Sequence, residues 1–340
     1  MSQSKNSPDY TSNPDLQFVK PNYSGNKLIH GKFTNEDKDV EAGFLKVLRW
    51  QFTRNPQKAE KKADTFRLQV IQNKTLSKQG LDKIVWLGHA TFLIRIQGQN
   101  LLIDPVFGNL PLIPRKSPLP CLPSDLTNIQ YLLISHGHRD HLDKPSIQQV
   151  LEYNPAVTVL APLQMQKLIY SFGKIRQYQE AGWYQSYQVT DGLEIIFLPA
   201  KHWHRRGLND FNEILWGSFL IRTKQVSIYF GGDSAYGAHF THIRQTVGPV
   251  DVCILPVGAY KPPFMMQGSH MNPMEAIQAF QDLQGKLLIP MHYGTFDLSD
   301  EPIGEPYRVL QQAELQKKIK GKLKLAAVGE EILLDTVIRQ

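Results

Sequence analysis

Cysteine is scarce in this sequence. Cys121 and Cys253 are the only two in 340 residues, and neither belongs to a Cys-x-x-Cys pair. We therefore expect neither a disulfide framework nor a thiolate zinc site. Both residues are interpreted as small buried hydrophobic side chains. Because nothing in the chain demands an oxidising compartment, the default expectation is a cytoplasmic protein.

Long apolar runs are missing as well. No stretch approaches the roughly 18 consecutive apolar residues of a membrane-spanning helix, so none is predicted. The N-terminal region also lacks the apolar centre of a secretory signal. Residues 1–24 are rich in Ser, Asn, Asp and Pro, which predicts a polar, disordered tail.

Positive charge exceeds negative charge: the formal net charge is +7 and the isoelectric point about 9.2. This excess favours an anionic partner, which could be a phosphorylated substrate, an anionic lipid surface or a nucleic acid. Residues 25–80 form a basic N-terminal extension. Within it Val40, Phe44, Val47 and Leu48 recur at helical spacing. This helix either packs on the main domain or lies on a membrane surface.

From residue 81 to residue 340, short apolar runs alternate with helical patterns. Such alternation predicts a folded domain of layered sheets with helices outside. Helices are expected after Asp143, which is a suitable N-cap, and over residues 273–283 and 307–318. Strands are expected over residues 84–87, 92–96, 101–103, 131–135, 157–160, 184–189, 193–198, 219–222, 226–230, 252–255 and 287–289.

One loop concentrates side chains that bind metals. His136, His138, Asp140 and His141 directly follow the apolar run 131–135. A loop that leaves a strand can direct several side chains at one point, whereas a regular strand would send them to opposite faces. Imidazole and carboxylate groups are suitable zinc ligands. The spacing therefore predicts a metal site at the end of this strand.

Further candidate ligands follow other predicted strands. His202, Asp233 and His292 each lie just beyond the C-terminal end of an apolar run. In sheets of this kind those ends gather on one rim, where sites are usually built. We therefore expect seven side chains to hold two zinc ions, or other divalent transition metals. One consistent division places His136, His138 and His202 on the first metal. Asp140, His141 and His292 would then bind the second metal, and Asp233 would bridge the two.

These motifs resemble two related groups of proteins. The pattern His-x-His-x-Asp-His, with a later His, Asp and His, resembles the metallo-β-lactamase superfamily. Narrower blocks resemble the N-acyl-phosphatidylethanolamine-hydrolysing phospholipase D family, in order from about Lys83 to Pro306. These blocks include Trp86-Leu-Gly-His-Ala-Thr91, Leu102-Ile-Asp-Pro105, Gly231-Gly-Asp-Ser-Ala-Tyr236 and His292-Tyr-Gly-Thr-Phe296.

The resemblance implies a fold and a reaction. The fold is an α/β metallo-β-lactamase αββα sandwich, in which two packed mixed β-sheets carry helices on their outer faces. The family's metal ligands fall on the seven residues given above. The implied enzyme is a metal-dependent phosphoric diester hydrolase of the phospholipase D type. A hydroxide formed from a water shared by the two metals, with a pKa lowered to about 7, would attack phosphorus. The products would be N-acylethanolamine and phosphatidate, and Asp140 and Asp233 would belong to the catalytic centre.

Several other residues could assist. His270 either assists departure of the leaving group or binds the phosphate, or it is only a histidine in a surface loop. Asp104 either accepts a hydrogen bond from a metal-bound imidazole or forms a turn before a proline. For His89 a structural hydrogen bond is favoured over metal ligation. Tyr260 and Arg206 are weaker candidates for contacting substrate.

Alternatives remain open. If the protein is a lipid phosphodiesterase, we expect a phospholipid substrate, contact with a membrane surface and an apolar groove near the metals. Six residues could line that groove: Leu110, Leu112, Ile113, Phe264, Met265 and Met266. A soluble substrate would instead suit a lactonase or a small phosphodiesterase. We expect no nucleic-acid partner, because no basic and aromatic stretch lies near the site. An intact ligand set argues against a non-enzymatic protein, and a homodimer is expected by analogy. His204 has no assigned role.

Overall fold

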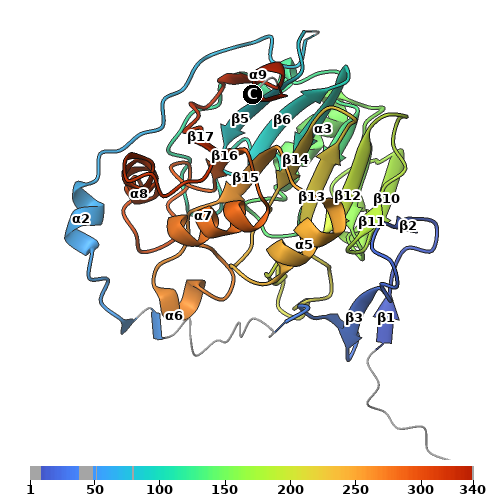
Figure 1. The fold of residues 1–340 in the computed structure, drawn as a ribbon, viewed down its shortest axis with the longest axis horizontal. Coiled ribbons are helices and arrows are strands. Elements are labelled where there is room, and N and C mark those ends of the chain that lie inside the picture. Colours follow the sequence, from blue (N-terminus) through green and yellow to red (C-terminus); the bar gives the residue numbers. More distant parts are fainter. Residues whose placement is uncertain (1–8, 38–48, 51, 79, 339–340) are drawn as a thin grey trace, which may run out of the picture.

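The computed structural model describes residues 9–37, 49–50, 52–78 and 80–338. The helix predicted around Val40 to Leu48 lies outside the described residues. Two large mixed sheets face each other and form the centre of the molecule (Figure 1). Their strands come from the region predicted to alternate between strand and helix, with one addition from the N-terminal segment.

The first sheet has seven strands. They are, in spatial order, β10 (Gln177–Ala181), β9 (Thr158–Pro162), β8 (Tyr131–Leu133), β7 (Gln99–Ile103), β6 (Thr91–Ile96), β5 (Lys83–Gly88) and β18 (Glu331–Leu333). Pairing is parallel from β10 to β7 and antiparallel from β7 to β18. The inner parallel strands β8 and β9 are almost wholly buried because both faces of this part of the sheet are covered, whereas the edge strand β10 is partly exposed.

The second sheet has eight strands. They are β17 (Lys322–Leu323), β16 (Leu287–Met291), β15 (Val252–Pro256), β14 (Ser227–Phe230), β13 (Ser218–Arg222), β12 (Glu194–Leu198), β11 (Gln185–Ser186) and β2 (Gln17–Phe18). Pairing is parallel from β17 to β14 and antiparallel from β14 to β2. The parallel strands of this sheet therefore direct their C-terminal ends to one rim.

Apolar side chains fill the space between the sheets. Trp86 and Phe92 of the first sheet join Phe197 and Phe230 of the second in one buried cluster. The rings of Phe92 and Phe230 meet edge to face, with centroids 6.0 Å apart. Burial of such large rings is the main source of stability for a two-sheet core.

Helices cover the outer faces. The first sheet carries α3 (Lys144–Tyr153), whose Ile147 and Val150 pack in a second buried cluster with its strands, together with α4 (Gln166–Tyr170). The second sheet carries α5 (His239–Val247), α7 (Pro273–Asp282) and α8 (Glu305–Leu315), which lie in front of it in Figure 1. The predicted αββα sandwich is thus confirmed. Shorter elements are η1 (Pro123–Asp125), α6 (Pro263–Met266) and α9 (Asp335–Ile338).

Local signals placed several elements correctly. Asp143 caps α3, since its carboxylate accepts a hydrogen bond from the Ser146 backbone N–H at 3.0 Å. The strand expected over residues 184–189 is shorter, because the Gln188 backbone binds the side chain of Gln179 instead of β12. The strand β10 and the helix α5 were not predicted.

The expectation of a loose tail through residue 24 is wrong for residues 9–24. Strand β2 completes the eight-stranded sheet by pairing with β11. The side chain of Gln185 holds this segment, since it bonds to the backbone of Asn13 and Leu16. A short separate sheet contains β1 (Asp9–Thr11), β3 (Asn26–Ile29) and β4 (Lys32–Phe33). Buried long-range hydrogen bonds, which composition does not reveal, order these polar residues.

The rest of the N-terminal extension runs along the domain. Its helix α2 (Lys58–Ala63) lies beside α8 (Figure 1), and Asp64 pairs with Arg308 at 2.9 Å. Further along, the Ile71 N–H donates to the Val328 carbonyl at 2.8 Å. Within the described part of the chain, no helix combines the length and apolar character needed to cross a bilayer.

Candidate metal centre

The predicted ligands lie at the C-terminal ends of strands from both sheets. The loop after β8 carries His136 to His141, and His292 directly follows β16. Three residues at this centre have positive φ although they are not glycine: His89 at 53°, Asp104 at 43° and His292 at 66°. Such conformations are costly and gather at functional sites, where the surrounding fold maintains them.

Three imidazole nitrogens form one cluster, called here the three-histidine group. His138 Nδ1 lies 3.0 Å from His136 Nε2 and 3.0 Å from His202 Nε2. A tetrahedral zinc ion with bonds of about 2.0–2.1 Å would separate its ligands by roughly 3.4 Å. The three nitrogens thus converge about as closely as ligands of a single ion, as predicted for the first metal.

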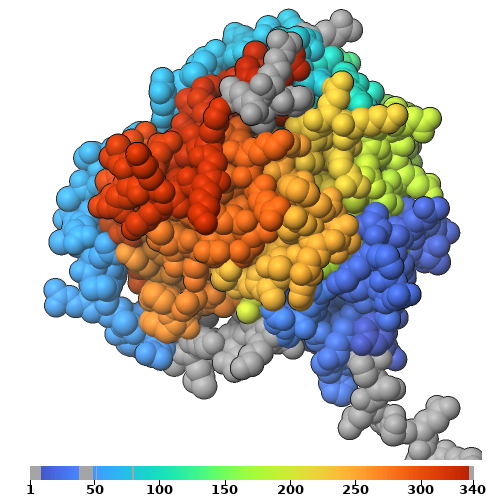
Figure 2. Space-filling model, in the orientation of Figure 1, coloured from blue at the N-terminus to red at the C-terminus, as the bar shows by residue number. Residues whose placement is uncertain are grey.

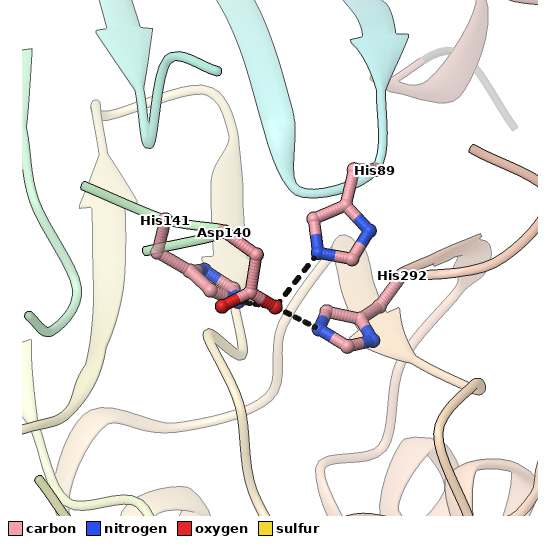
Figure 3. Close-up of side chains that lie close together, drawn as sticks. All are labelled: His89, Asp140, His141 and His292. Atoms are coloured by element: carbon pink, nitrogen blue, oxygen red, sulfur yellow. Dashed lines mark hydrogen bonds and ion pairs between the residues drawn. The ribbon is translucent and has the colours of Figure 1, made fainter. Parts of the chain in front are cut away.

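A carboxylate is at the centre of the second cluster, called here the Asp140 group (Figure 3). Asp140 Oδ2 lies 3.1 Å from His89 Nε2, 3.4 Å from His292 Nε2 and 3.8 Å from His141 Nε2. All four residues can offer ligand atoms to a single ion. The sequence predicted three of them for the second metal, and the structure adds His89.

Asp233 lies between the two groups. Its Oδ2 is 3.9 Å from His202 Nε2 and 3.2 Å from His141 Nε2, and its Oδ1 is 3.2 Å from His292 Nε2. One carboxylate therefore reaches both groups, which is the position expected of a bridging ligand. The structure brings together all seven side chains that the sequence singled out.

Burial and charge set the protonation of this cluster. Burial and the neighbouring imidazoles keep the pKa of His136 and His202 well below the usual value. Burial alone would raise the pKa of Asp140 and Asp233, but the imidazoles, with His141 first, hold both well below the usual range. Neutral imidazoles beside ionised carboxylates are the forms that bind a cation.

The donor set also leaves buried atoms unsatisfied. His141 Nε2, His292 Nε2 and Asp233 Oδ1 are buried and make no hydrogen bond of good geometry. Buried polar atoms normally have a partner, so these three need an explanation. They belong to two histidines of the Asp140 group and to Asp233, and they face one another at ion-pair distance, so they fit metal ligation. The residues present therefore suit one or more divalent cations.

Comparison with known proteins agrees with this geometry. The family model described as "Beta-lactamase superfamily domain" matches residues 99–293. The chain belongs to the beta-lactamase superfamily. Among curated relatives, it is 31% identical over 227 residues to N-acyl-phosphatidylethanolamine-hydrolyzing phospholipase D 1 of Caenorhabditis elegans. It is also 31% identical over 237 residues to the mitochondrial protein of that name from Saccharomyces cerevisiae.

The chain and these relatives overlap only in part. The match covers 63% of this chain and 64% of the worm protein, and 66% of this chain and 50% of the yeast protein. A possible metal-dependent hydrolase from Veillonella parvula has a TM-score of 0.60 at 17% identity, covering 75% of this chain and all of that one. An isothiocyanate hydrolase from Delia radicum gut bacteria has a TM-score of 0.58 at 17% identity, covering 74% and 98%. At such identities the solved structures establish the superfamily fold.

Within this superfamily member, polar neighbours orient the imidazoles. His141 Nδ1 lies 2.8 Å from Asp104 Oδ2, so its Nε2 faces the centre. Asp104 is itself held by the Ser135 backbone N–H at 2.8 Å. Asp104 is thus placed to accept a hydrogen bond from the imidazole of a predicted ligand, as expected. His202 Nδ1 donates to the Ser269 carbonyl at 3.0 Å, which directs its Nε2 at the centre in the same way.

His89 and His270, whose roles the sequence left open, both lie at the metal centre. His89 has the favoured hydrogen bond, to Asp140, and burial lowers its pKa to about 3. His270 Nδ1 lies 3.8 Å from Asp233 Oδ2, and its side chain is 13% exposed, so it can reach both the cluster and an incoming molecule. Burial lowers its pKa to about 4, so it is neutral at pH 7.

Two proposed substrate contacts have other roles. Arg206 Nη1 donates to the Gly137 carbonyl at 3.0 Å and the Leu142 carbonyl at 2.7 Å, so it braces the ligand loop. Tyr260 is buried and its hydroxyl donates to Glu305. These internal contacts do not test an interaction with substrate, so the contact of Arg206 or Tyr260 with substrate stays a prediction.

His204 has a structural role that the sequence did not reveal. Its ring is fully buried and lies parallel to that of His138, with centroids 6.1 Å apart. A Cβ at position 137 would lie 2.2 Å from His204 Cε1. Only glycine therefore fits between His136 and His138 while this ring packs behind the loop.

Proposed function

We propose that this protein is a two-zinc phosphodiesterase that hydrolyses N-acyl-phosphatidylethanolamine to N-acylethanolamine and phosphatidate. The convergence of the three-histidine group and the Asp140 group on Asp233 carries this proposal. Bound zinc would supply a hydroxide nucleophile at neutral pH, because it lowers the pKa of bound water to about 7. The named phospholipase D relatives support the choice of a phosphodiester substrate.

The residues of this chain divide the remaining work. Asp233 and Asp140 supply the negative charge that holds the cations between buried imidazoles. Asp104 and Ser269 fix the orientation of two of those imidazoles. His270 carries a neutral N–H that can donate a hydrogen bond to a phosphate oxygen or to the departing alkoxide oxygen. The phosphate is thereby oriented for attack from the side opposite the leaving oxygen.

Apolar side chains beside the centre support a lipid substrate. Leu110 is buried against Phe296, whose ring centroid lies 5.0 Å from that of His89. Two residues further along the same loop, Leu112 is fully exposed. The loop that contains Arg206 also exposes Leu208, which is 86% accessible. Exposed leucines on a protein of net charge +7 suit peripheral contact with an anionic membrane.

The helix α6 is the other predicted part of the groove. Phe264, Met265 and Met266 are half-buried, and the Met266 carbonyl accepts the backbone N–H of His270. These apolar residues therefore lie next to the proposed phosphate-binding histidine. A phospholipid at a membrane surface remains the proposed partner, with no nucleic acid, and a homodimer remains a prediction.

One assay tests this function against the alternative. Purified protein is offered N-acyl-phosphatidylethanolamine in mixed micelles, an N-acyl homoserine lactone and bis(p-nitrophenyl) phosphate, each with and without chelator. We expect release of N-acylethanolamine that the chelator abolishes and added zinc restores. Opening of the lactone alone, or hydrolysis of the small phosphodiester alone, would replace the lipid substrate by a soluble one.

A further inference from the structure

The N-terminal segment, residues 9–37, holds the loop that carries the predicted metal ligand His202. Figure 2 shows this segment in blue, lying against the yellow and light-orange surface around α5. Beneath that surface, the Phe33 N–H donates to the Asn212 carbonyl at 2.8 Å. Asn212 in turn exchanges two hydrogen bonds with the backbone of His204, at 3.0 and 2.8 Å. The loop of residues 202–212 is therefore attached to a segment far away in sequence.

Asn35 makes the closest of these contacts. Its Oδ1 accepts the His202 backbone N–H at 3.1 Å, and its Nδ2 donates to the His202 carbonyl at 3.0 Å. The residues are 167 positions apart, and both are buried. A primary amide is the side chain that can satisfy a backbone donor and a backbone acceptor of the same residue together. Asn35 thus acts on His202 as a neighbouring strand would.

The two sides of His202 are held by different elements. Asn35 holds its backbone, while the Ser269 carbonyl accepts the imidazole Nδ1–H at 3.0 Å. With backbone and ring both anchored, Nε2 keeps its place 3.0 Å from His138 Nδ1. Groups that orient a ligand in this way commonly change metal affinity by about 10–100-fold when they are lost.

We infer that Asn35 is a positioning residue of the metal centre, so that the N-terminal segment is a functional part of the three-histidine group. This inference rests on the proposed metal chemistry and adds a residue from outside the matched superfamily domain, which begins at residue 99. The other contacts of the segment attach it to the domain, but only Asn35 bonds to a predicted ligand among the described contacts of residues 9–37.

The test compares two buried asparagines of the same segment. Asn35→Ala removes both hydrogen bonds to His202. The control Asn26→Ala removes an acceptor for the Trp183 backbone N–H at 3.0 Å, and this bond does not involve a predicted ligand. Zinc-loaded full-length proteins are mixed with a chromophoric chelator, and the rate of zinc release is measured without substrate. Thermal midpoints are recorded for each protein.

We expect Asn35→Ala to release zinc from one class of site about tenfold faster or more, and Asn26→Ala to stay within about twofold of the parent protein. The cobalt-substituted Asn35 variant should also show an altered visible absorption spectrum. If Asn35→Ala does not fold, Asn35→Asp replaces it: the shape is kept and the donor to the His202 carbonyl is lost, so the same acceleration is expected.

Three results would count against this role. Unchanged zinc release from the Asn35 variants, with zinc bound normally by the parent protein, would overturn the inference and leave the proposed function intact. Equal acceleration by Asn26→Ala at a similar thermal midpoint would overturn it as well, since general loosening would then explain the effect. Absence of zinc from the parent protein would overturn the proposed metal chemistry and the inference together.

Discussion

The three-histidine group and the Asp140 group share Asp233 but carry charge differently. In the first, burial lowers the pKa of all three imidazoles, that of His138 to about 4, so they are neutral donors at pH 7. In the second, burial again opposes charge, but Asp233 and Asp140 raise the pKa of His292 to about 9. The same residue type in one buried cluster thus takes opposite protonation states. The pKa of His292, which faces both Asp233 and Asp140, is raised, whereas burial and the charge of His292 lower the pKa of His89 to about 3 although it bonds to Asp140.

This difference says how each group would hold a cation. The three-histidine group offers preformed neutral ligands and little charge, so geometry should dominate its affinity. The Asp140 group offers charge, and protons compete with a cation there.

Replacing the shared carboxylate should have the largest effect. Asp233→Asn leaves the shape intact but removes the charge that both groups face. We expect loss of metal from both groups and a fall in phosphodiesterase activity of at least about a thousandfold, because cation and nucleophile are lost together. Metal content by mass spectrometry and turnover of the lipid check this. Retention of the full metal content would show that the groups do not depend on Asp233.

Replacing the carboxylate behind one imidazole should affect one group. Asp104→Asn weakens the bond that directly orients His141. Among the described contacts, the three-histidine group meets Asp104 only indirectly, through the Ser135 hydroxyl that bonds to Asp104 and lies 3.0 Å from His136 Nδ1. We expect metal affinity at the Asp140 group to fall about 10–100-fold. Titration with a competing chelator should resolve one weakened and one unchanged site. Equal weakening of both sites would contradict the separation of the groups.

The pH dependence of metal binding should differ between the groups. In the metal-free protein the pKa of His292 is raised to about 9 and that of His141 well above its usual value, so both must lose a proton to bind. Affinity at the Asp140 group should therefore rise about tenfold or more per pH unit between pH 7 and 9. The three-histidine group is already neutral there, so its affinity should change little. Calorimetric titrations in buffers across this range measure both. Equal slopes would contradict the assigned protonation states.

The same shift predicts a change in stability of the metal-free protein. The pKa of His292 is raised from 6.5 to about 9 in the folded protein, so protonation of this residue stabilises the folded state. This contribution is complete below pH 6.5 and is lost as the pH rises through 9. Thermal midpoints of the metal-free protein should therefore fall between pH 7 and pH 9. Saturating metal should remove this dependence, because the cation replaces the proton.

Loosening the ligand loop should have the smallest effect. Arg206→Ala leaves the Gly137 and Leu142 carbonyls without their donor, at a cost to unfolding free energy of about 1–3 kcal/mol. We expect a severalfold lower kcat with little change in KM. Arg205→Ala is the matched control, because Arg205 is exposed and bonds only to the neighbouring Gly207 and Leu208 carbonyls. A rise in KM for Arg206→Ala alone would restore its earlier assignment to substrate binding.

Some features of the site follow from neighbours along the chain. The succession of strands along the chain depends on apolar periodicity, and the cap of α3 at Asp143 depends on a local hydrogen bond. Short spacing along the chain brings together His136, His138, Asp140 and His141. The later His202, Asp233 and His292 could be added because parallel strands end on a common rim. These signals act over a few residues or through a general rule of sheet geometry, so they can be interpreted without coordinates.

Other features depend on contacts between distant segments. Asn35 and Ser269 hold His202 from opposite sides, and neither has a local pattern that marks it. The same is true of β2, which joins a sheet edge through Gln185, and of Arg206, whose direction depends on the carbonyls it meets. Composition predicted a disordered tail for the residues of β2, and Arg206 was only a weak candidate for contacting substrate. Thus the sequence alone determined which groups could bind metal, whereas contacts between distant segments determined the orientation of those groups. The reason is that buried donors and acceptors must find a partner, and only the folded chain determines which partners lie within hydrogen-bond distance.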